Sequence, residues 1–184
     1  MSESPREHAQ QALVTLRTRV DAHFSAASAR QSDQIHCRLG CDGCCAPGLS
    51  VFGVEAAPIA DALAQMARDN PALRQVVRDR GRAADSLDRC ALLVAGRCTV
   101  YEARPIICRS HGVAVRDPDG DVGYCELNFD TAEPEAGTVL ELEAVNRPLA
   151  VMAHMFDGGA RVRLAALARG DESVGPARAD ADAT

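Results

Sequence analysis

The stretch around which this chain is organised reads Cys37-Arg38-Leu39-Gly40-Cys41-Asp42-Gly43-Cys44-Cys45. It places four thiols within nine residues. The two glycines between the thiols allow the tight backbone turns that several sulfurs need in order to converge on one point. Clustered thiolates are soft ligands that suit Zn²⁺ and iron–sulfur clusters. We therefore expect this stretch to be a metal-binding loop.

A second cysteine-rich segment, residues 90–125, is expected to return to this loop. It carries the remaining four of the eight cysteines, namely Cys90, Cys98, Cys108 and Cys125. We expect Cys44 and Cys108 to contact the same metal centre. Cys125 lies on an expected strand and is the weakest of the eight candidate ligands.

The charge of such a centre suggests roles for the residues around the cysteines. Four thiolates leave a net charge of −2 on Zn²⁺, or on a cubane cluster whose core carries +2. Arg38, Arg104 and Arg109 lie within or beside the cysteine motifs and can offset that charge. Tyr101 can donate its hydroxyl to a sulfur or a carbonyl. Arg104 precedes Pro105, so its backbone is held extended and its side chain can brace the loop.

Composition places the chain among soluble, cytoplasmic proteins. Its 184 residues are enough for one domain with a core, and its net charge of −6 argues against binding to nucleic acid or to an anionic membrane surface. We find no apolar run long enough to span a membrane and no signal-peptide core at the N-terminus. In a reducing cytosol, clustered cysteines are more often metal ligands than disulfides.

Hydrophobic periodicity predicts a mainly α fold, a small helical domain with a cysteine-rich metal-binding loop region and a short β-hairpin. A capping box of Ser4 and Glu7 should start the first helix. The expected helices cover residues 4–30, 54–69, 71–87, 138–157 and 162–168. The expected hairpin pairs residues 111–115 with 122–127 around the turn at 117–120. We expect residues 1–169 to form a single domain and residues 170–184 a disordered tail.

Two segments of the chain resemble a known family. The first is the cluster ending in Cys44-Cys45. The second is Cys90-Ala91-Leu92-Leu93, followed by Cys98-x-x-Tyr101-x-x-Arg104-Pro105-x-x-Cys108-Arg109. With these, the chain resembles the CxxCxxCC, or YkgJ-type, cysteine-cluster family, which is proposed to chelate zinc or iron. It departs from the pattern in two places: three residues separate Cys37 from Cys41, where the family usually has two, and Ala91 stands where proline is common. The resemblance implies a metal-chelating domain and supplies no reaction.

Several alternatives remain open at this point. Eight cysteines permit two four-thiolate sites, or one site with spare thiols. The spacing Cys37-x₃-Cys41-x₂-Cys44 also matches the triad of radical S-adenosylmethionine enzymes, and Cys41-x-x-Cys44 matches a thioredoxin-like redox pair. The helical pattern offers neither the alternating βα units of the first nor the βαβ unit of the second.

Two histidines lie next to the cysteine motifs. His36 and His111 could act as mixed ligands or as proton carriers. The favoured hypothesis is a cytosolic protein that holds Zn²⁺ or an iron–sulfur cluster for storage, delivery or structural support. The alternative is a metal-dependent enzyme or redox protein that uses the same cysteines. No protein partner is indicated.

Overall fold

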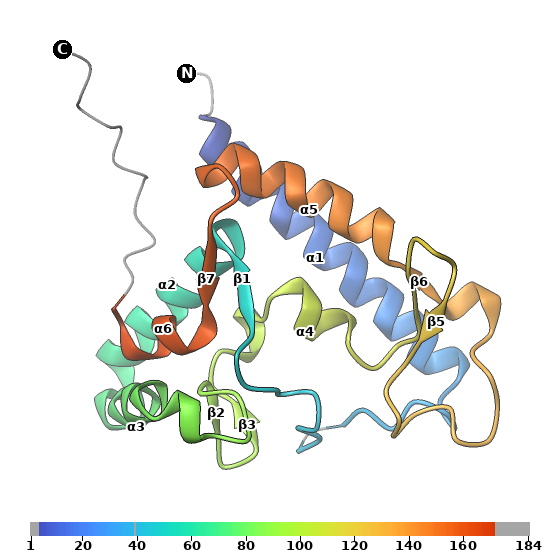
Figure 1. The fold of residues 1–184 in the computed structure, drawn as a ribbon, viewed down its shortest axis with the longest axis horizontal. Coiled ribbons are helices and arrows are strands. Elements are labelled where there is room, and N and C mark those ends of the chain that lie inside the picture. Colours follow the sequence, from blue (N-terminus) through green and yellow to red (C-terminus); the bar gives the residue numbers. More distant parts are fainter. Residues whose placement is uncertain (1–3, 39, 172–184) are drawn as a thin grey trace.

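The computed structural model describes residues 4–38 and 40–171. Two long helices, α1 (Pro5–Arg30) and α5 (Leu142–Asp157), lie side by side (Figure 1). The predicted capping box is confirmed at the start of α1. The Ser4 hydroxyl accepts a hydrogen bond from the Glu7 amide at 3.2 Å, and the Glu7 carboxylate accepts one from the Ser4 amide at 2.7 Å. These bonds satisfy backbone donors that a helix start leaves unpaired.

The helix α5 continues through Pro148 and ends at Gly158, whose φ of +79° is a left-handed cap. Its apolar side faces the apolar side of α1, and this contact is the centre of the first hydrophobic core. The larger buried apolar residues of the two helices are Leu13, Leu16, Val20, Val145, Leu149, Met152 and Phe156. Each such side chain stabilises the fold by about 1.5–3 kcal/mol when it leaves water.

The second layer contains α2 (Gly53–Asp69), α3 (Pro71–Arg82) and α6 (Leu164–Arg169), which enclose a second hydrophobic core. Asn70 caps α3 by accepting the Leu73 amide at 3.0 Å. The third helix is shorter than predicted. After Arg82 the chain forms a 3₁₀ turn, Ala84–Ser86, because the Ser86 hydroxyl and amide both bind the Ala83 carbonyl and close the helix end.

Three small sheets complete the structure. Strand β1 (Ser50–Phe52) pairs antiparallel with β7 (Arg161–Arg163), and β2 (Leu93–Val94) pairs antiparallel with β3 (Arg97–Cys98). The predicted hairpin is present as β4 (Val115–Arg116) and β5 (Val122–Gly123), with much shorter arms than expected.

The arms are short for two reasons. The chain turns at residues 125–128, where the Asn128 amide binds the Cys125 carbonyl, and the other edge of β4 pairs in parallel with β6 (Leu140–Glu141). A short 3₁₀ turn, Ala136–Thr138, precedes β6.

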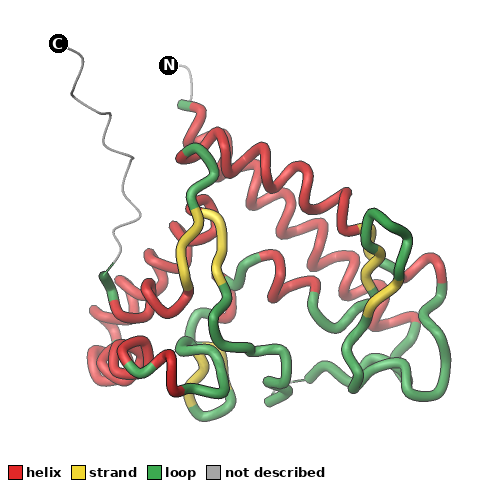
Figure 2. The backbone as a smooth tube through the Cα atoms, viewed as in Figure 1, coloured by secondary structure: helices red, strands yellow, loops and turns green. Residues whose placement is uncertain are grey.

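The short helix α4 (Ile106–Ser110) lies between the α1–α5 pair and the loops that carry most of the cysteines (Figure 2). The loop that follows α1 passes along this side of the molecule before it enters β1. The hairpin of β2 and β3 lies on the same side. The fold thus brings both cysteine-rich segments to the boundary between the two hydrophobic cores.

Within the described part of the chain, no helix combines the length and the apolar character needed to cross a membrane. The predicted tail begins at Gly170, which caps α6 with a φ of +85°. From residue 172 onward, that prediction lies outside the described residues.

The contact between α3 and α6 generates a stability prediction. A Cβ on Gly81 would lie 2.7 Å from the Arg169 backbone nitrogen and 3.0 Å from the Ala165 carbonyl. Backbone atoms cannot move aside as a flexible side chain can. Gly81→Ala should therefore lower the free energy of unfolding by about 1–2 kcal/mol, even though alanine has the higher helix propensity.

Thermal unfolding measures this effect, and a loss of that size corresponds to a drop of about 3–6 °C in a domain of this length. The matched control is Gly123→Ala, where an added Cβ meets no atom within 4 Å. Equal melting temperatures for the two variants would show that α3 and α6 are not packed this closely.

Candidate metal centre

A cavity of about 620 Å³ lies where the two cores meet, and thiols from both segments line it. Its lining includes seven of the eight cysteines: Cys37, Cys41, Cys44, Cys45, Cys90, Cys98 and Cys108. All eight cysteines are free thiols. Cys125 is not among the residues that line this cavity in the described part of the chain.

Tight turns hold the thiols of the first segment. The Cys41 amide binds the Arg38 carbonyl, and the Cys45 amide binds the Asp42 carbonyl, each at 2.9 Å. Gly40 has a φ of +89°, a conformation that residues with a Cβ rarely adopt. The expected loop is therefore confirmed. Cys37 and Cys41 are exposed, whereas Cys44 and Cys45 are half-buried.

A backbone hydrogen bond joins the two cysteine segments directly. The Cys90 amide donates to the Cys45 carbonyl at 2.7 Å. Arg80 of α3 donates to the Cys90 carbonyl at 3.3 Å and so anchors this junction to the second core. The pairing of β2 with β3 places Leu93 opposite Cys98, so the hairpin returns the Cys98 thiol towards Cys90.

A buried carboxylate fixes the helix that carries Cys108. Glu55, in the first turn of α2, is 4% exposed and accepts the Ile106 amide at 2.8 Å, at the start of α4. It also accepts the Phe52 amide at 3.4 Å. Burial raises the pKa of Glu55, while the two amides and the charge of Arg17 lower it. One side chain therefore ties the start of α2 to the start of α4.

Arg109 is almost completely buried, and its guanidinium donates hydrogen bonds to other groups of the protein. Its guanidinium donates to Asp21 of α1 at 2.5 Å, to the Arg104 carbonyl at 2.8 Å and to the Glu102 carbonyl. The side chain lines the cavity, but its charge is paired with Asp21. Arg109 thus holds the turn before Pro105 against α1. Cys108, its neighbour on α4, is therefore positioned by contacts between residues that are far apart in the sequence.

Arg104 is the cation whose charge acts on three of the thiols, and the charge of Arg80 acts on a fourth, Cys90. The charge of Arg104 lowers the pKa of Cys44, Cys98 and Cys108. In each case a larger effect raises the pKa: burial for Cys98 and Cys108, and the hydrogen bond with Cys45 for Cys44. Its guanidinium lies over the ring of Tyr101, 3.4 Å from the ring centre, and its Nε donates to the Tyr101 carbonyl at 2.9 Å. Arg104, Tyr101 and Arg38 all line the cavity.

Burial and crowding hold most of these thiols in the protonated form. Burial, followed by the charges of Cys90, Cys98 and Cys44, raises the pKa of Cys108 to about 12. Burial is also the largest cause that raises the pKa of Cys90 and of Cys98. The cavity therefore collects thiols in a place where their anions are unstable unless a cation neutralises them.

The vicinal pair behaves differently from the other thiols. The hydrogen bond between the Cys44 and Cys45 side chains is the largest cause that raises the pKa of Cys44, and it is also the largest cause that lowers the pKa of Cys45. These directions correspond to a Cys44 thiol that donates and a Cys45 sulfur that accepts. Of the two thiols, Cys45 should lose its proton first in the metal-free protein.

Sequence reasoning missed Asn128, which is 2% exposed. Its side-chain NH₂ donates to the Gly112 carbonyl at 2.6 Å and to the Cys37 sulfur at 3.5 Å, and its side-chain oxygen accepts the His36 amide at 2.9 Å. No local pattern marks this asparagine, because all these contacts are distant in the sequence. Of the candidate histidines, His111 lines the cavity, whereas His36 lies 3.7 Å from Asp130 in a partly exposed pair.

The donor set fits a metal, although the side chains are not arranged around one. Among the described residues, no group of three or more Cys, His, Asp or Glu side chains stands ready to hold a metal ion. The chemistry of seven thiols around one cavity, with a cationic Arg104 beside them, nevertheless suits Zn²⁺ or an iron–sulfur cluster. Binding would require thiol side chains to change rotamer and lose their protons.

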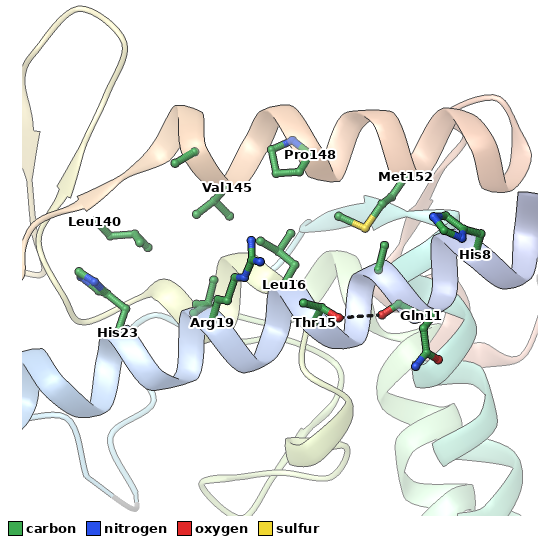
Figure 3. A pocket seen from close by; sticks show the side chains of 13 residues that line it. His8, Gln11, Thr15, Leu16, Arg19, His23, Leu140, Val145, Pro148 and Met152 are labelled. Carbon is green, nitrogen blue, oxygen red and sulfur yellow. Dashed lines mark hydrogen bonds between the residues drawn. The ribbon is translucent and has the colours of Figure 1, made fainter.

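A second cavity, of about 630 Å³, lies between α1 and α5 and differs in character (Figure 3). Leu16, Val145 and Met152 give it an apolar wall, and His8 and His23 stand near its two ends. It contains no cysteine in the described part of the chain. The thiol chemistry is therefore confined to the first cavity and its surroundings.

The fold also bears on the two rival motif interpretations. The described residues form sheets of two or three short strands, and helices do not alternate with parallel strands in the manner of a βα barrel. The same arrangement lacks the βαβ unit expected around a thioredoxin-like pair. The cysteines at 37, 41 and 44 therefore sit in neither context within the described structure.

The fold and the site together define a class: a helical protein in which cysteines from two separate segments of the chain line one cavity. Residues 36–131, just over half of the chain, match the family model described as "CxxCxxCC: Putative zinc- or iron-chelating domain". The chain belongs to this family, which confirms the resemblance found in the cysteine motifs. No curated protein and no solved structure matches the chain at a significant level.

The vicinal pair gives a reactivity prediction for the metal-free protein. Because its pKa is lowered, Cys45 should react with iodoacetamide at a lower pH than Cys44, whose pKa is raised. Cys108 should stay unmodified through the neutral range, since its pKa is raised to about 12. Peptide mass spectrometry with fragmentation separates the adjacent sites.

Two variants at one position test the cause. Cys44→Ser keeps a hydroxyl donor and should preserve the early reaction of Cys45, whereas Cys44→Ala removes the donor and should move the reaction to higher pH. Reaction of Cys44 before Cys45 in the unmodified chain would contradict the assigned direction of the hydrogen bond.

Proposed function

We propose that this protein binds a metal centre, Zn²⁺ or an iron–sulfur cluster, through thiolates contributed by both of its cysteine segments. The observation that carries the proposal is the cavity at the junction of the two cores, where seven thiols from positions 37–108 converge. If these cysteines served only as small apolar core residues, they would pack closely and leave no cavity between them. The open space between the thiols therefore supports a bound group.

The residues of this chain divide into ligands and supports. The cysteines bind the centre, and the bound metal supplies the positive charge that keeps them ionised. Arg104 adds positive charge beside Cys44, Cys98 and Cys108. Glu55 and Arg109 position α4 and the turn before it. Tyr101 supports the Arg104 guanidinium from the exposed side of the site.

The role we infer is that of a cytosolic metal-binding module for storage, delivery or structural support. Eight free thiols suit a reducing compartment. Many structural zinc sites use four cysteine ligands and leave no open position for a substrate. With eight thiols available, this chain can complete such a site with protein ligands alone.

One observation favours a second candidate, a metal-dependent enzyme or redox protein. The same cavity is also lined by His111, Glu102 and Tyr101, which offer proton-transfer groups next to the thiols. A centre that kept one open coordination position beside His111 could bind a substrate there. A spectrum that shows full thiolate coordination would favour the binding module over this alternative.

The test of the proposal is anaerobic purification followed by metal analysis, acid-labile sulfide analysis and an absorption spectrum. Zinc without sulfide identifies a zinc site, and iron with sulfide identifies a cluster. Purified protein that holds neither, and that takes up neither on reconstitution, would contradict the proposal.

A substitution in α4 links the metal to the fold. Cys108→Ser should lose the metal that this thiol helps to hold and should lower the melting temperature, because structural zinc contributes on the order of 10 kcal/mol to folding. Ile107→Ser is the matched control, since Ile107 is the exposed neighbour on the same short helix. If Cys108→Ser keeps full metal content and wild-type stability, Cys108 is not a ligand.

We also propose that residues 1–169 form the metal-binding domain and that the tail is dispensable. The tail sequence is rich in Asp, Ala, Gly and Pro and has no apolar periodicity, so it gains little by ordering. Removal of residues 172–184 should leave metal content and melting temperature unchanged. Removal of residues 164–184 should lower both, because it also deletes α6 from the second core.

A further inference from the structure

The eight thiols separate into two groups, and the first group is assembled around Cys37. The buried Asn128 side-chain amide contacts the Cys37 sulfur at 3.5 Å, and the Asn128 backbone amide binds the Cys125 carbonyl at 2.9 Å. One asparagine therefore connects the loop after α1 to the turn that carries Cys125. The Cys37 sulfur also packs against Gly112, where an added Cβ would overlap it.

A tight turn keeps Cys41 close to Cys37, because the Cys41 amide binds the Arg38 carbonyl at 2.9 Å. Burial is the largest cause that raises the pKa of Cys37, and the charges of Cys41, Cys125 and Cys44 raise it further. The charge of Cys125 thus raises the pKa of Cys37, although Cys125 does not line the cavity. The first group consists of Cys37, Cys41, Cys44 and Cys125.

The second group is assembled around the hydrogen bond between the Cys45 carbonyl and the Cys90 amide. The pairing of β2 with β3 brings Cys98 to the same place, and α4 brings Cys108. The charges of Cys90, Cys98 and Cys108 all act on Cys45, and those of Cys90 and Cys98 act most strongly on Cys108. The second group consists of Cys45, Cys90, Cys98 and Cys108.

The vicinal cysteines lie at the boundary between the groups. Cys44 acts on Cys37 and also on Cys108, so it is near both. Cys45 is fixed to the second group by its backbone bond to Cys90. The Cys44 and Cys45 thiols share a hydrogen bond in this metal-free state, and a change of rotamer would let one member of the pair serve each group. Three thiols of the first group and all four thiols of the second group line the same cavity.

We infer that the chain holds two four-thiolate metal centres rather than one, an outer centre bound by Cys37, Cys41, Cys44 and Cys125 and an inner centre bound by Cys45, Cys90, Cys98 and Cys108. The inference rests on the proposed function and assigns all eight thiols. It revises two expectations from the sequence: Cys45 rather than Cys44 shares a centre with Cys108, and Cys125 is a full ligand.

The test is a titration of the full-length, metal-free chain with Co²⁺ under anaerobic conditions, followed by displacement with Zn²⁺. Thiolate-to-cobalt charge transfer and the intensity of the visible bands report four-coordinate thiolate sites. The expected result is saturation at two Co²⁺ per chain. Native mass spectrometry gives the same number without relying on the spectrum.

Paired variants locate the two centres. Cys125→Ser should weaken one Co²⁺ site and leave the spectrum of one tetrathiolate site, and Cys98→Ser should do the same to the other site. The double variant should lose both tetrathiolate signatures. Asn128→Ala, which removes no thiol, should weaken the same site as Cys125→Ser and spare the site affected by Cys98→Ser.

The outcomes separate this inference from the proposed function. Saturation at one Co²⁺ per chain overturns the two-centre assignment and leaves the proposed function standing. Complete loss of binding in both Cys125→Ser and Cys98→Ser, with each variant still folded by circular dichroism, also overturns it, because the thiols would then form one centre. Absence of Co²⁺ binding by the unmodified chain overturns the two-centre assignment, and it overturns the proposed function as well only if iron–sulfur reconstitution also fails.

Discussion

Electrostatics constrains everything else in this structure: thiolates that share a half-buried cavity repel one another and lose their hydration. Burial and neighbouring thiols raise the pKa of Cys108 to about 12 and also raise that of Cys37. Without a cation, the thiols whose pKa is raised stay protonated. A bound metal replaces those protons, so its affinity should depend on pH and its binding should be coupled to folding. The arrangement of the thiols is that expected of a site that needs a bound cation to stabilise its thiolates.

The helices fix the backbone of the segments that carry the cysteines, and they do not fix the positions of the sulfur atoms directly. Arg109 joins α4 to α1 through Asp21, and Glu55 joins α4 to α2. Both side chains are buried and have their polar atoms paired, so each junction would be costly to break. The cysteine backbones are therefore positioned by the helices, and metal binding would require only the thiol side chains to change rotamer.

Much of the frame was predictable because its signals are local. The capping box of Ser4 and Glu7, the Asn70 cap and the Gly158 stop each lie within a few residues of the helix ends they determine. The spacing of the first four cysteines is a local signal of the same kind, and it correctly predicted a loop. Apolar periodicity predicted a third helix longer than the observed α3. The contact of Ser86 with Ala83 that closes the helix end does not affect the spacing of apolar residues.

The contacts that bring the two cysteine segments together could not be predicted, because they join residues far apart in the sequence. Asn128 contacts residues 16 and 91 positions away in the sequence, and Glu55 contacts an amide 51 positions away. A single sequence carries no signal for such pairs. The division of the thiols between two groups depends on the same contacts, which is why the spacing of the cysteines left the number of centres open.

Gly112 carries a consequence for the comparison of related chains. Its φ of +109° and the Cys37 sulfur above it leave room for hydrogen alone. A homologue with a larger residue at this position would have to place its first cysteine elsewhere, whatever its spacing to the second. Alignment of the glycine after the histidine, together with the asparagine at 128, would therefore distinguish chains that share this geometry from chains that share only the cysteine motif.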